Sequence, residues 1–135
     1  NALEDLVRAR YERYKIVEEK EQRAEEYRTE DADVIVVAYG ASSRVARSAV
    51  NKAREAGKKV GLIRPITLWP FPKDAIKRAA DHAKELLVVE MSMGQMVDDV
   101  RLAAECRVPV HFYGRTGGVI PTPKEILGEI DKLLK

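Results

Sequence analysis

The sequence VIVVAYGASSR, from Val34 to Arg44, decides the fold of this chain. Its first part, Val34–Tyr39, is a continuous apolar run rich in β-branched residues, which is typical of a strand buried on both faces of a parallel sheet. A segment with helical spacing, Ser43–Ala56, follows the glycine and the serines. This order predicts the beginning of a strand–helix–strand unit.

The same alternation of apolar runs and helical segments continues along the chain. Further strands are predicted at Lys59–Arg64, Glu85–Met91 and Val108–Tyr113, and further helices at Lys73–Lys84, Gly94–Glu105 and Pro123–Leu134. Strands that alternate with helices build a parallel sheet with helices on both faces. We therefore expect a three-layer α/β domain whose four strands lie in the order 2-1-3-4.

Helix-capping signals support these assignments. The segments SMGQ (Ser92–Gln95) and TPKE (Thr122–Glu125) both have the spacing of a capping box, in which a hydroxyl and a Gln or Glu satisfy two backbone N–H groups. Pro123 falls at the first helical position, where its missing N–H costs nothing. Gly57 suits a left-handed helix C-terminus.

The N-terminal segment differs from the rest of the chain. From Leu3 to about Glu30 it contains no glycine or proline, and an apolar stripe with helical spacing covers only Leu3–Val17. We predict a long exposed linker helix over residues 1–31, followed by the α/β domain over residues 32–135. The stripe packs either on this domain or on a partner or missing domain.

Composition excludes several classes of protein. The chain has 135 residues, and 24 basic against 22 acidic side chains leave a net charge of +2, which does not favour nucleic-acid binding. Its one cysteine, Cys106, cannot form an internal disulfide or a cysteine cluster, and it suits the reducing cytoplasm. No apolar run reaches transmembrane length and no secretory signal is present. Because the chain opens at Asn1 in mid-helix, we interpret it as a piece of a longer protein.

No complete active site is visible in the pattern. The loop Gly40–Arg44 lacks two glycines of a dinucleotide fingerprint, and the next strand ends in Arg64 instead of an acid, so NAD binding is not expected. Ser42 and Ser43 are interpreted as helix caps, since no nucleophile elbow surrounds them. We predict no catalytic residue and no metal ligand in this chain.

Other polar residues have structural interpretations. Glu90 ends a strand at the edge where such sheets bind ligands; we interpret it as a partner of Arg64 or of a helix N-terminus, with a catalytic carboxylate as the alternative. His82 is predicted to be solvated, and His111 to be a satisfied core or edge histidine. Asp98 and Asp99 should face out of their helix.

Two loops are built for contact or for close approach. In RPITLWPFP (Arg64–Pro72), Trp69 and Phe71 stand between prolines in a stiff apolar loop that favours an interface. In HFYGRTGGVIPTP (His111–Pro123), the glycines do not lead directly into the helix as in a phosphate-binding loop, because VIPTP intervenes. A structural turn is the favoured interpretation, with Arg115 as the feature that it explains least.

Three ordered strings then resemble one family. LIRPITLWPFP, VVEMSMGQMVDDV and FYGRTGGVIPTPKEI resemble the C-terminal domain of the alpha subunit of 2-oxoacid:ferredoxin oxidoreductases, over about residues 30–135. The resemblance implies a transketolase C-terminal-like fold preceded by a linker helix. It implies an accessory domain of an enzyme that decarboxylates 2-oxoisovalerate or 2-oxoglutarate, forms an acyl-CoA and reduces ferredoxin.

The resemblance also implies cofactors and partners. Thiamine diphosphate, Mg²⁺, iron–sulfur clusters and CoA belong to the assembled enzyme, and none is expected in this fragment, which should be inactive alone. The implied partners are the beta, gamma and delta-type subunits, a missing N-terminal domain, and ferredoxin, with self-association also possible; nucleic acid and membrane are not expected.

Two alternatives from the residues themselves stay open, namely a stand-alone anion- or nucleotide-binding module and a pure assembly domain. Calorimetric titration with CoA and nucleotides would separate them. We hypothesise that the loop with Arg115 contacts another domain or subunit near the CoA or substrate entrance. The candidates for interface or ligand-edge residues are Gly40, Ser42, Ser43, Arg64, Trp69, Phe71, Glu90, Gly94, Gln95, Gly114, Arg115, Gly117 and Gly118.

Overall fold

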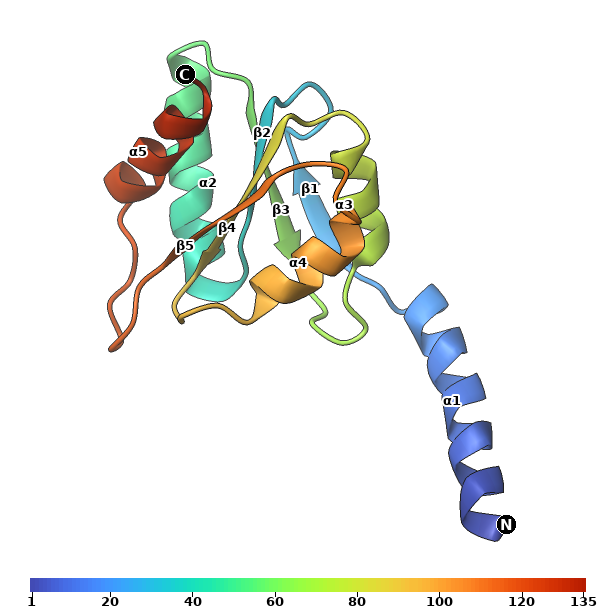
Figure 1. Cartoon of the computed structure of the whole chain (residues 1–135). Helices are drawn as coiled ribbons and strands as arrows, with labels where there is room; N and C mark the ends of the chain where they lie inside the picture. The colour runs from blue at the N-terminus through green and yellow to red at the C-terminus, as the bar shows by residue number, and fades with distance from the viewer.

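The computed structural model describes all 135 residues, which form a five-stranded sheet between two layers of helices, with one helix projecting away (Figure 1). The strands are β1 (Ala24–Tyr27), β2 (Val34–Val37), β3 (Val60–Pro65), β4 (Glu85–Glu90) and β5 (Val110–Gly114). The helices are α1 (Ala2–Lys20), α2 (Gly40–Glu55), α3 (Lys73–Ala80), α4 (Met96–Ala104) and α5 (Pro123–Leu133). The predicted α/β three-layer class is confirmed.

The sheet has the order β1-β3-β2-β4-β5. β2 lies in the middle and pairs in parallel with β3 and β4, and β5 adds in parallel to β4. The four predicted strands are β2, β3, β4 and β5 in chain order. Their order in the sheet, β3-β2-β4-β5, is the predicted order 2-1-3-4. All four residues of β2 are buried, as a strand covered on both faces requires.

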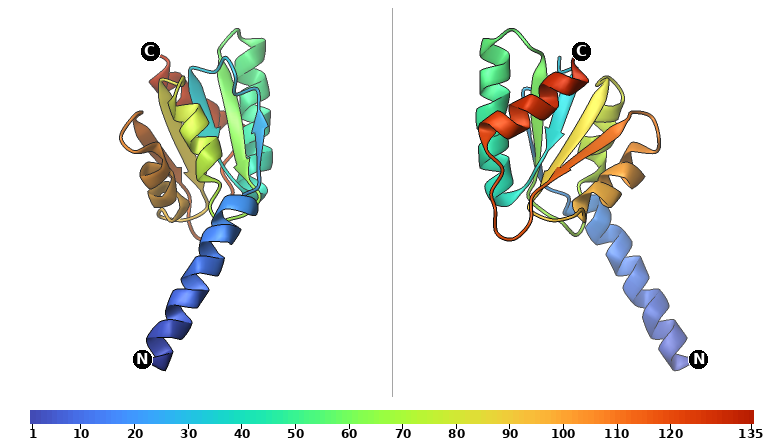
Figure 2. Two further views of the ribbon diagram at one scale, coloured as in Figure 1. Left: turned by 90° about the vertical axis from the view of Figure 1, so that its right-hand side faces the viewer. Right: turned by 60° about the vertical axis from the view of Figure 1, so that its left-hand side comes forward.

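Helices cover both faces of the sheet (Figure 2), and each face has its own core. Ile35 and Val37 of β2 pack with residues of α3 and α4 on one face, whereas Val36 packs with residues of α2 and α5 on the other. Successive residues of a strand point to opposite faces, so one short apolar run serves both cores. The order of apolar residues thus fixes which helices cover which face.

The prediction of one helix over residues 1–31 is wrong in its second half. α1 ends at Lys20, and Ala24–Tyr27 form the edge strand β1, which is antiparallel to β3. Tertiary contacts outweigh the helical preference of this charged segment. Glu25 pairs with Arg64 and Arg47, and Glu26 pairs with Arg78, all of them distant in sequence.

The first part of that segment, α1, is a helix that for most of its length does not pack on the α/β domain. No residue of α1 is buried, and the helix extends away from the sheet with the N-terminus at its far tip (Figure 1). The alternative in which the apolar stripe packs on its own domain is wrong for most of its length. None of the helices combines the length and the apolar character needed to cross a membrane.

Two of the three predicted helix ends are confirmed. Thr122 and Glu125 form the complete capping box of α5, and Gly57 adopts a left-handed conformation (φ 78°) after α2. The capping box at Ser92–Gln95 is wrong, because α4 begins only at Met96 and has no side-chain cap from Gln95. A different residue, Glu90, satisfies the first N–H groups of α4 instead.

Candidate functional site

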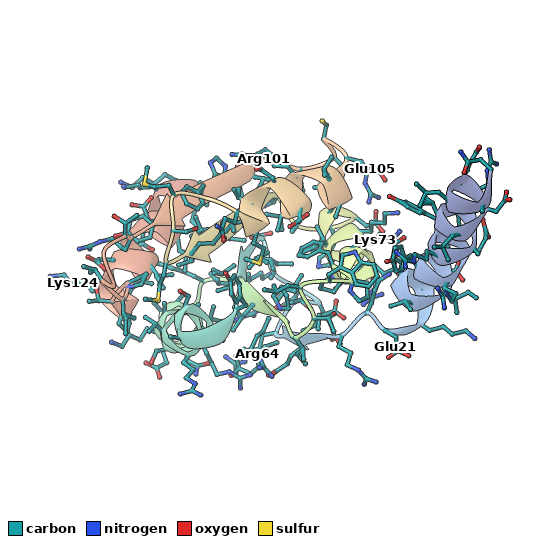
Figure 3. All side chains as sticks on the ribbon, turned by 90° about the horizontal axis from the view of Figure 1, so that it is seen from below. Glu21, Arg64, Lys73, Arg101, Glu105 and Lys124 are labelled. Carbon is teal, nitrogen blue, oxygen red and sulfur yellow. The ribbon has the colours of Figure 1, made fainter.

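The candidate residues meet at one edge of the sheet. The loops that follow β2, β3, β4 and β5 all leave from the carboxyl ends of parallel strands, at the bottom of Figure 1, and α1 projects from the same edge. Figure 3 looks onto this edge, with Arg64 near α2 and with α1 to one side beyond Glu21. Sheets of this kind bind ligands at this edge.

Glu90, at the end of β4, is fully occupied by the N-terminus of α4. Its side chain is 1% exposed, and its carboxylate accepts hydrogen bonds from the backbone N–H groups of Gln95 (3.1 Å), Met96 (2.8 Å) and Val97 (3.1 Å). The interpretation of Glu90 as a partner of a helix N-terminus is confirmed, whereas Arg64 pairs with Glu25 instead. An anion at a helix N-terminus offsets the helix dipole, so this carboxylate stabilises the fold.

Ser42 and Ser43 are not helix caps. α2 begins at Gly40, and its N-cap residue, Tyr39, has no side-chain capping bond, so both serines lie inside the first turn. The Ser43 hydroxyl donates to the carbonyl oxygen of Gly40 at 2.6 Å, a local bond that serine makes inside helices. Both are buried, and no histidine or carboxylate is hydrogen-bonded to either hydroxyl.

A cavity of about 510 Å³ opens between α2, β1 and the end of β3. We call it the arginine pocket; its lining residues are Glu25, Gly40, Ala41, Ser43, Arg44, Arg47 and Arg64. The Arg64 guanidinium donates to Glu25 at 2.9 and 3.1 Å, and Arg47 binds the other oxygen of the same carboxylate. Hydrogen bonding from Arg64 is the main cause that lowers the pKa of Glu25, with the charge of Arg47 adding to it.

Sequence reasoning missed the arginine pocket as a unit. Arg64 is among the sequence candidates, but the predicted helix over residues 1–31 includes Glu25, and Arg47 is not singled out. The sequence indicated the positive charge of the pocket in part. Arg44 and Arg47 lie near the start of the predicted helix Ser43–Ala56, and Arg64 ends the next predicted strand. Only the pairing of β1 with β3 brings a carboxylate to them.

The loop after β5 packs tightly on the loop after β4. A Cβ atom at Gly114 would lie 2.3 Å from the carbonyl oxygen of Ser92 and 2.5 Å from the Phe112 ring, so only glycine permits this approach. The backbone N–H of Arg115 donates to the carbonyl oxygen of Glu90 at 3.1 Å. Gly94 and Gln95 thus belong to a loop that Gly114 holds in place.

Arg115 has a partner within the chain. Its guanidinium pairs with Glu125, the same residue that completes the capping box of α5, and both side chains are partly exposed. Hydrogen bonding from the Thr122 backbone and the charge of Arg115 lower the pKa of Glu125. Gly117 and Gly118 turn the chain beyond it, and residues 119–122 separate them from α5. The geometry agrees with a structural turn more than with a phosphate cradle.

The loop after β3 presents one aromatic ring outward and one inward. Phe71 is partly buried and packs against the core beneath α3, whereas Trp69 is 58% exposed. The Trp69 ring meets the Tyr14 ring edge-on at a centroid distance of 5.5 Å, and Tyr14 meets Tyr11 at 5.7 Å. A cavity of about 700 Å³ lies along these rings.

These rings continue the apolar stripe of α1. We call the combined area the aromatic surface; it consists of the exposed side chains Leu3, Leu6, Val7, Tyr11, Tyr14 and Trp69. Arg10 follows Leu6 and Val7 at helical spacing and forms no ion pair with any residue of the chain. An exposed apolar area of this extent on one protruding helix is typical of a contact surface.

The remaining sequence candidates are mostly structural. His111 on β5 bonds Glu85 at 2.7 Å, which confirms it as a satisfied edge histidine. His82 is exposed as predicted, and its ring nitrogens also bond the carbonyl oxygens of Thr29 and Arg78. Asp98 and Asp99 face out of α4 as expected.

The methionines around Gly94 divide between core and surface. Met96 is buried beneath α4, whereas Met91 and Met93 are exposed beside the loop after β4.

The residues present do not fit the cofactors that the resemblance implies. One cysteine cannot hold an iron–sulfur cluster, which usually takes four thiolates. No group of three histidine, cysteine, aspartate or glutamate side chains comes together to hold a metal ion such as the Mg²⁺ that accompanies a diphosphate.

Comparison with known proteins defines the class of the chain. Residues 32–126 match the family of the pyruvate:ferredoxin oxidoreductase core domain II, and the chain belongs to this family. The predicted relationship to a 2-oxoacid:ferredoxin oxidoreductase subunit with a transketolase C-terminal-like domain is therefore confirmed.

Individual relatives narrow the class. The chain is 50% identical over 119 residues to the ketoisovalerate oxidoreductase subunit VorB of Methanothermobacter thermautotrophicus, which covers 88% of this chain and 34% of the relative. It is 44% identical over 102 residues to the 2-oxoglutarate synthase subunit KorA of Methanothermobacter marburgensis, covering 76% of this chain and 27% of the relative. The chain thus spans between about a quarter and a third of the length of these relatives.

Solved structures give the same picture. A 2-oxoglutarate:ferredoxin oxidoreductase from Magnetococcus marinus, solved with 2-oxoglutarate, coenzyme A and succinyl-CoA bound, superimposes with a TM-score of 0.85 and 25% identity, over 98% of this chain and 23% of that chain. A split-gene transketolase superimposes with a TM-score of 0.67 over 83% of this chain, and at 18% identity it supports the fold alone.

Proposed function

We propose that this chain is the C-terminal, non-catalytic domain of the alpha subunit of a 2-oxoacid:ferredoxin oxidoreductase, and that it serves assembly of the enzyme. The observation that carries the proposal is the aromatic surface, which the chain itself leaves uncovered. The carboxyl edge offers no catalytic constellation, because Glu90 is bonded to α4 and the two serines lack an activating base.

The reaction of the whole enzyme follows from its relatives. We propose oxidative decarboxylation of a 2-oxoacid on thiamine diphosphate, with formation of an acyl-CoA and reduction of ferredoxin through iron–sulfur clusters. The greater identity to the ketoisovalerate relative favours 2-oxoisovalerate over 2-oxoglutarate as the substrate. The proposed partners are the beta, gamma and delta-type subunits and an N-terminal domain of the same subunit, in the cytoplasm.

The physical argument for assembly rests on α1. An isolated helix of 19 residues is marginal in water, because most helical stability in proteins comes from packing of an apolar face. Covering each exposed large side chain of the aromatic surface would contribute about 1–2 kcal/mol. Covering the six side chains of this surface on a partner would therefore stabilise the helix.

The positive charge of Arg10 indicates what kind of surface the partner of α1 presents. Arg10 lies within the apolar stripe and lacks a carboxylate, so a second copy of α1 packed about this point would bring two guanidinium groups together. We therefore favour a different partner, an apolar surface that carries one carboxylate opposite Arg10. Such a pair, removed from water, gives specificity to the contact.

We also propose the boundary between linker and domain at residues 31 and 32. The family match beginning at residue 32 supports it. β1 (Ala24–Tyr27) precedes this boundary and pairs with β3, so residues 24–31 are the part of the linker that attaches it to the domain. We further propose that Gly117, Gly118 and Arg115 contact a neighbouring domain or subunit near the CoA or substrate entrance.

The test is reconstitution of this chain with the remaining subunits and domains of its enzyme. The chain alone should bind no thiamine diphosphate with Mg²⁺, and it should co-purify with the rest. Leu6→Glu should weaken assembly at least tenfold by placing a charge in the stripe. Ile16→Glu is the matched control, since Ile16 is an equally exposed side chain on another face of α1. Equal effects of the two variants, or tight binding of thiamine diphosphate to the chain alone, would contradict the proposal.

The arginine pocket favours the second candidate function, a stand-alone anion- or nucleotide-binding module. Calorimetric titration of the isolated chain with CoA and nucleotides separates the two candidates. Binding in the micromolar range, together with failure to assemble, would replace the first candidate by the second.

A further inference from the structure

The arginine pocket carries an excess of positive charge. Three guanidinium groups and one carboxylate line it, which leaves two positive charges in excess. Glu25 already bonds both Arg47 and Arg64, and Arg44 forms no ion pair in the chain. Like charges held close together repel one another, so an anion bound between these guanidinium groups would relieve the repulsion.

The arginines are held ready for a ligand. Glu25 lies between Arg47 and Arg64 and fixes both, and the Arg47 guanidinium also lies over the Tyr27 ring, 4.3 Å from its centroid. Fixing these long side chains in the folded chain lowers the entropy lost when a ligand binds. The guanidinium fork suits the oxygens of carboxylates and phosphates.

The backbone adds donors of the same kind. The first turn of α2, Gly40–Ser43, borders the pocket, and it contains neither a capping side chain nor an acidic residue. The first N–H groups of a helix lack partners within the helix and attract anions. Here they supplement the arginines, which supply the charge.

We propose that the arginine pocket is a binding site for a phosphate monoester. A dianion matches the two excess positive charges, whereas a single carboxylate would leave one unpaired. The cavity of about 510 Å³ is larger than a phosphate group, so it also accommodates part of the molecule that carries the phosphate. The site lies apart from the aromatic surface and does not depend on the proposed role in assembly.

The experiment is a titration of the isolated chain with inorganic phosphate at constant ionic strength, followed by backbone amide and arginine Nε signals in NMR spectra. Saturable shifts should be confined to residues 40–44 and to the Nε signals of Arg44, Arg47 and Arg64. Arg44→Ala should weaken binding by about fivefold or more, since it removes one charged donor. Arg44 is exposed and unpaired, so this variant should fold normally.

Two further variants make the test specific. Glu25→Gln keeps a side-chain oxygen that can accept a hydrogen bond from an arginine and removes the only negative charge of the pocket, so it should strengthen binding about threefold or more. Arg101→Ala, on the exposed face of α4, changes net charge as Arg44→Ala does and should leave binding unchanged. The proposal is overturned if phosphate up to about 50 mM, well above ordinary weak-site affinities, gives no saturable shift, or if Arg44→Ala and Arg101→Ala have the same effect.

Discussion

The N-termini of α4 and α2 lie at the same edge of the sheet, but they face side chains of opposite charge. α4 begins against the buried Glu90 carboxylate, which accepts from the N–H groups of three successive residues. α2 begins beside three arginines, without a capping side chain. The first N-terminus is closed by the chain itself, and the second is left available. Position in the fold therefore does not decide which helix N-terminus can bind a ligand; the charges of the side chains beside that N-terminus do.

The largest change in stability is expected when Glu90, which closes the N-terminus of α4, is replaced. Glu90→Gln places an amide N–H₂ or a neutral oxygen against the N–H groups of α4, and we expect unfolding free energy to fall by about 2–4 kcal/mol. Urea denaturation followed by circular dichroism measures it. Glu55→Gln, at an exposed position without an ion pair, should change stability by less than about 0.5 kcal/mol. A loss at Glu90 no larger than at Glu55 would refute the structural role.

The loop beside α4 should tolerate no side chain at Gly114. A methyl group there would press on the Ser92 carbonyl oxygen, and we expect Gly114→Ala to cost about 2–3 kcal/mol. Gly128→Ala is the matched control, because a Cβ at this position in α5 meets nothing within 4 Å and alanine favours a helix. It should stabilise the chain by about 0.5–1 kcal/mol. Thermal unfolding of both variants gives the comparison, and equal signs would show the packing argument to be wrong.

The smallest expected change in stability is the part that Glu25 of the arginine pocket contributes to the loss of stability at low pH. The folded-state pKa of Glu25 is lowered from 4.5, so its ionised form contributes stability above that value and the contribution is lost as the pH falls below it. The hydrogen bonds from Arg54 lower the pKa of Asp31 to about 2, so ionised Asp31 also contributes stability that is lost at low pH. We expect Glu25→Gln to flatten the decline of the urea midpoint below about pH 4.5 while the Asp31 part remains. An unchanged pH profile would show that Glu25 contributes nothing.

The parts of the fold predicted from sequence were those with local signals. The apolar run of Val34–Val37 indicated a central strand, and the Thr122–Glu125 spacing indicated a helix start; both depend on neighbouring residues only. β1 was missed because it is short and polar, and its stabilising partners Arg64 and Arg78 lie about 40–50 residues away in sequence. The false capping box at Ser92 has the same origin, since the buried Glu90 competes for the same N–H groups.

The candidate site was predicted in part for the same reason. The edge that gathers Gly40, Arg64, Glu90 and Gly114 follows from strand order alone. The ion pairs of Arg115 with Glu125 and of Arg64 with Glu25 do not, because they depend on side-chain positions set by β1 and α5. The partner of Glu90 was therefore predictable from the strand order, whereas the side-chain partners of Arg64 and Arg115 were not.

The most direct test of the central claim, that this domain serves assembly through the aromatic surface, is hydrogen exchange along α1. Amides of residues 3–17 should exchange rapidly in the isolated chain, because nothing covers this helix. In the complex with the remaining subunits, the same amides should become about 100-fold or more better protected, while those of β2 hardly change. A complex that forms while α1 stays as exposed as in the isolated chain would contradict the account.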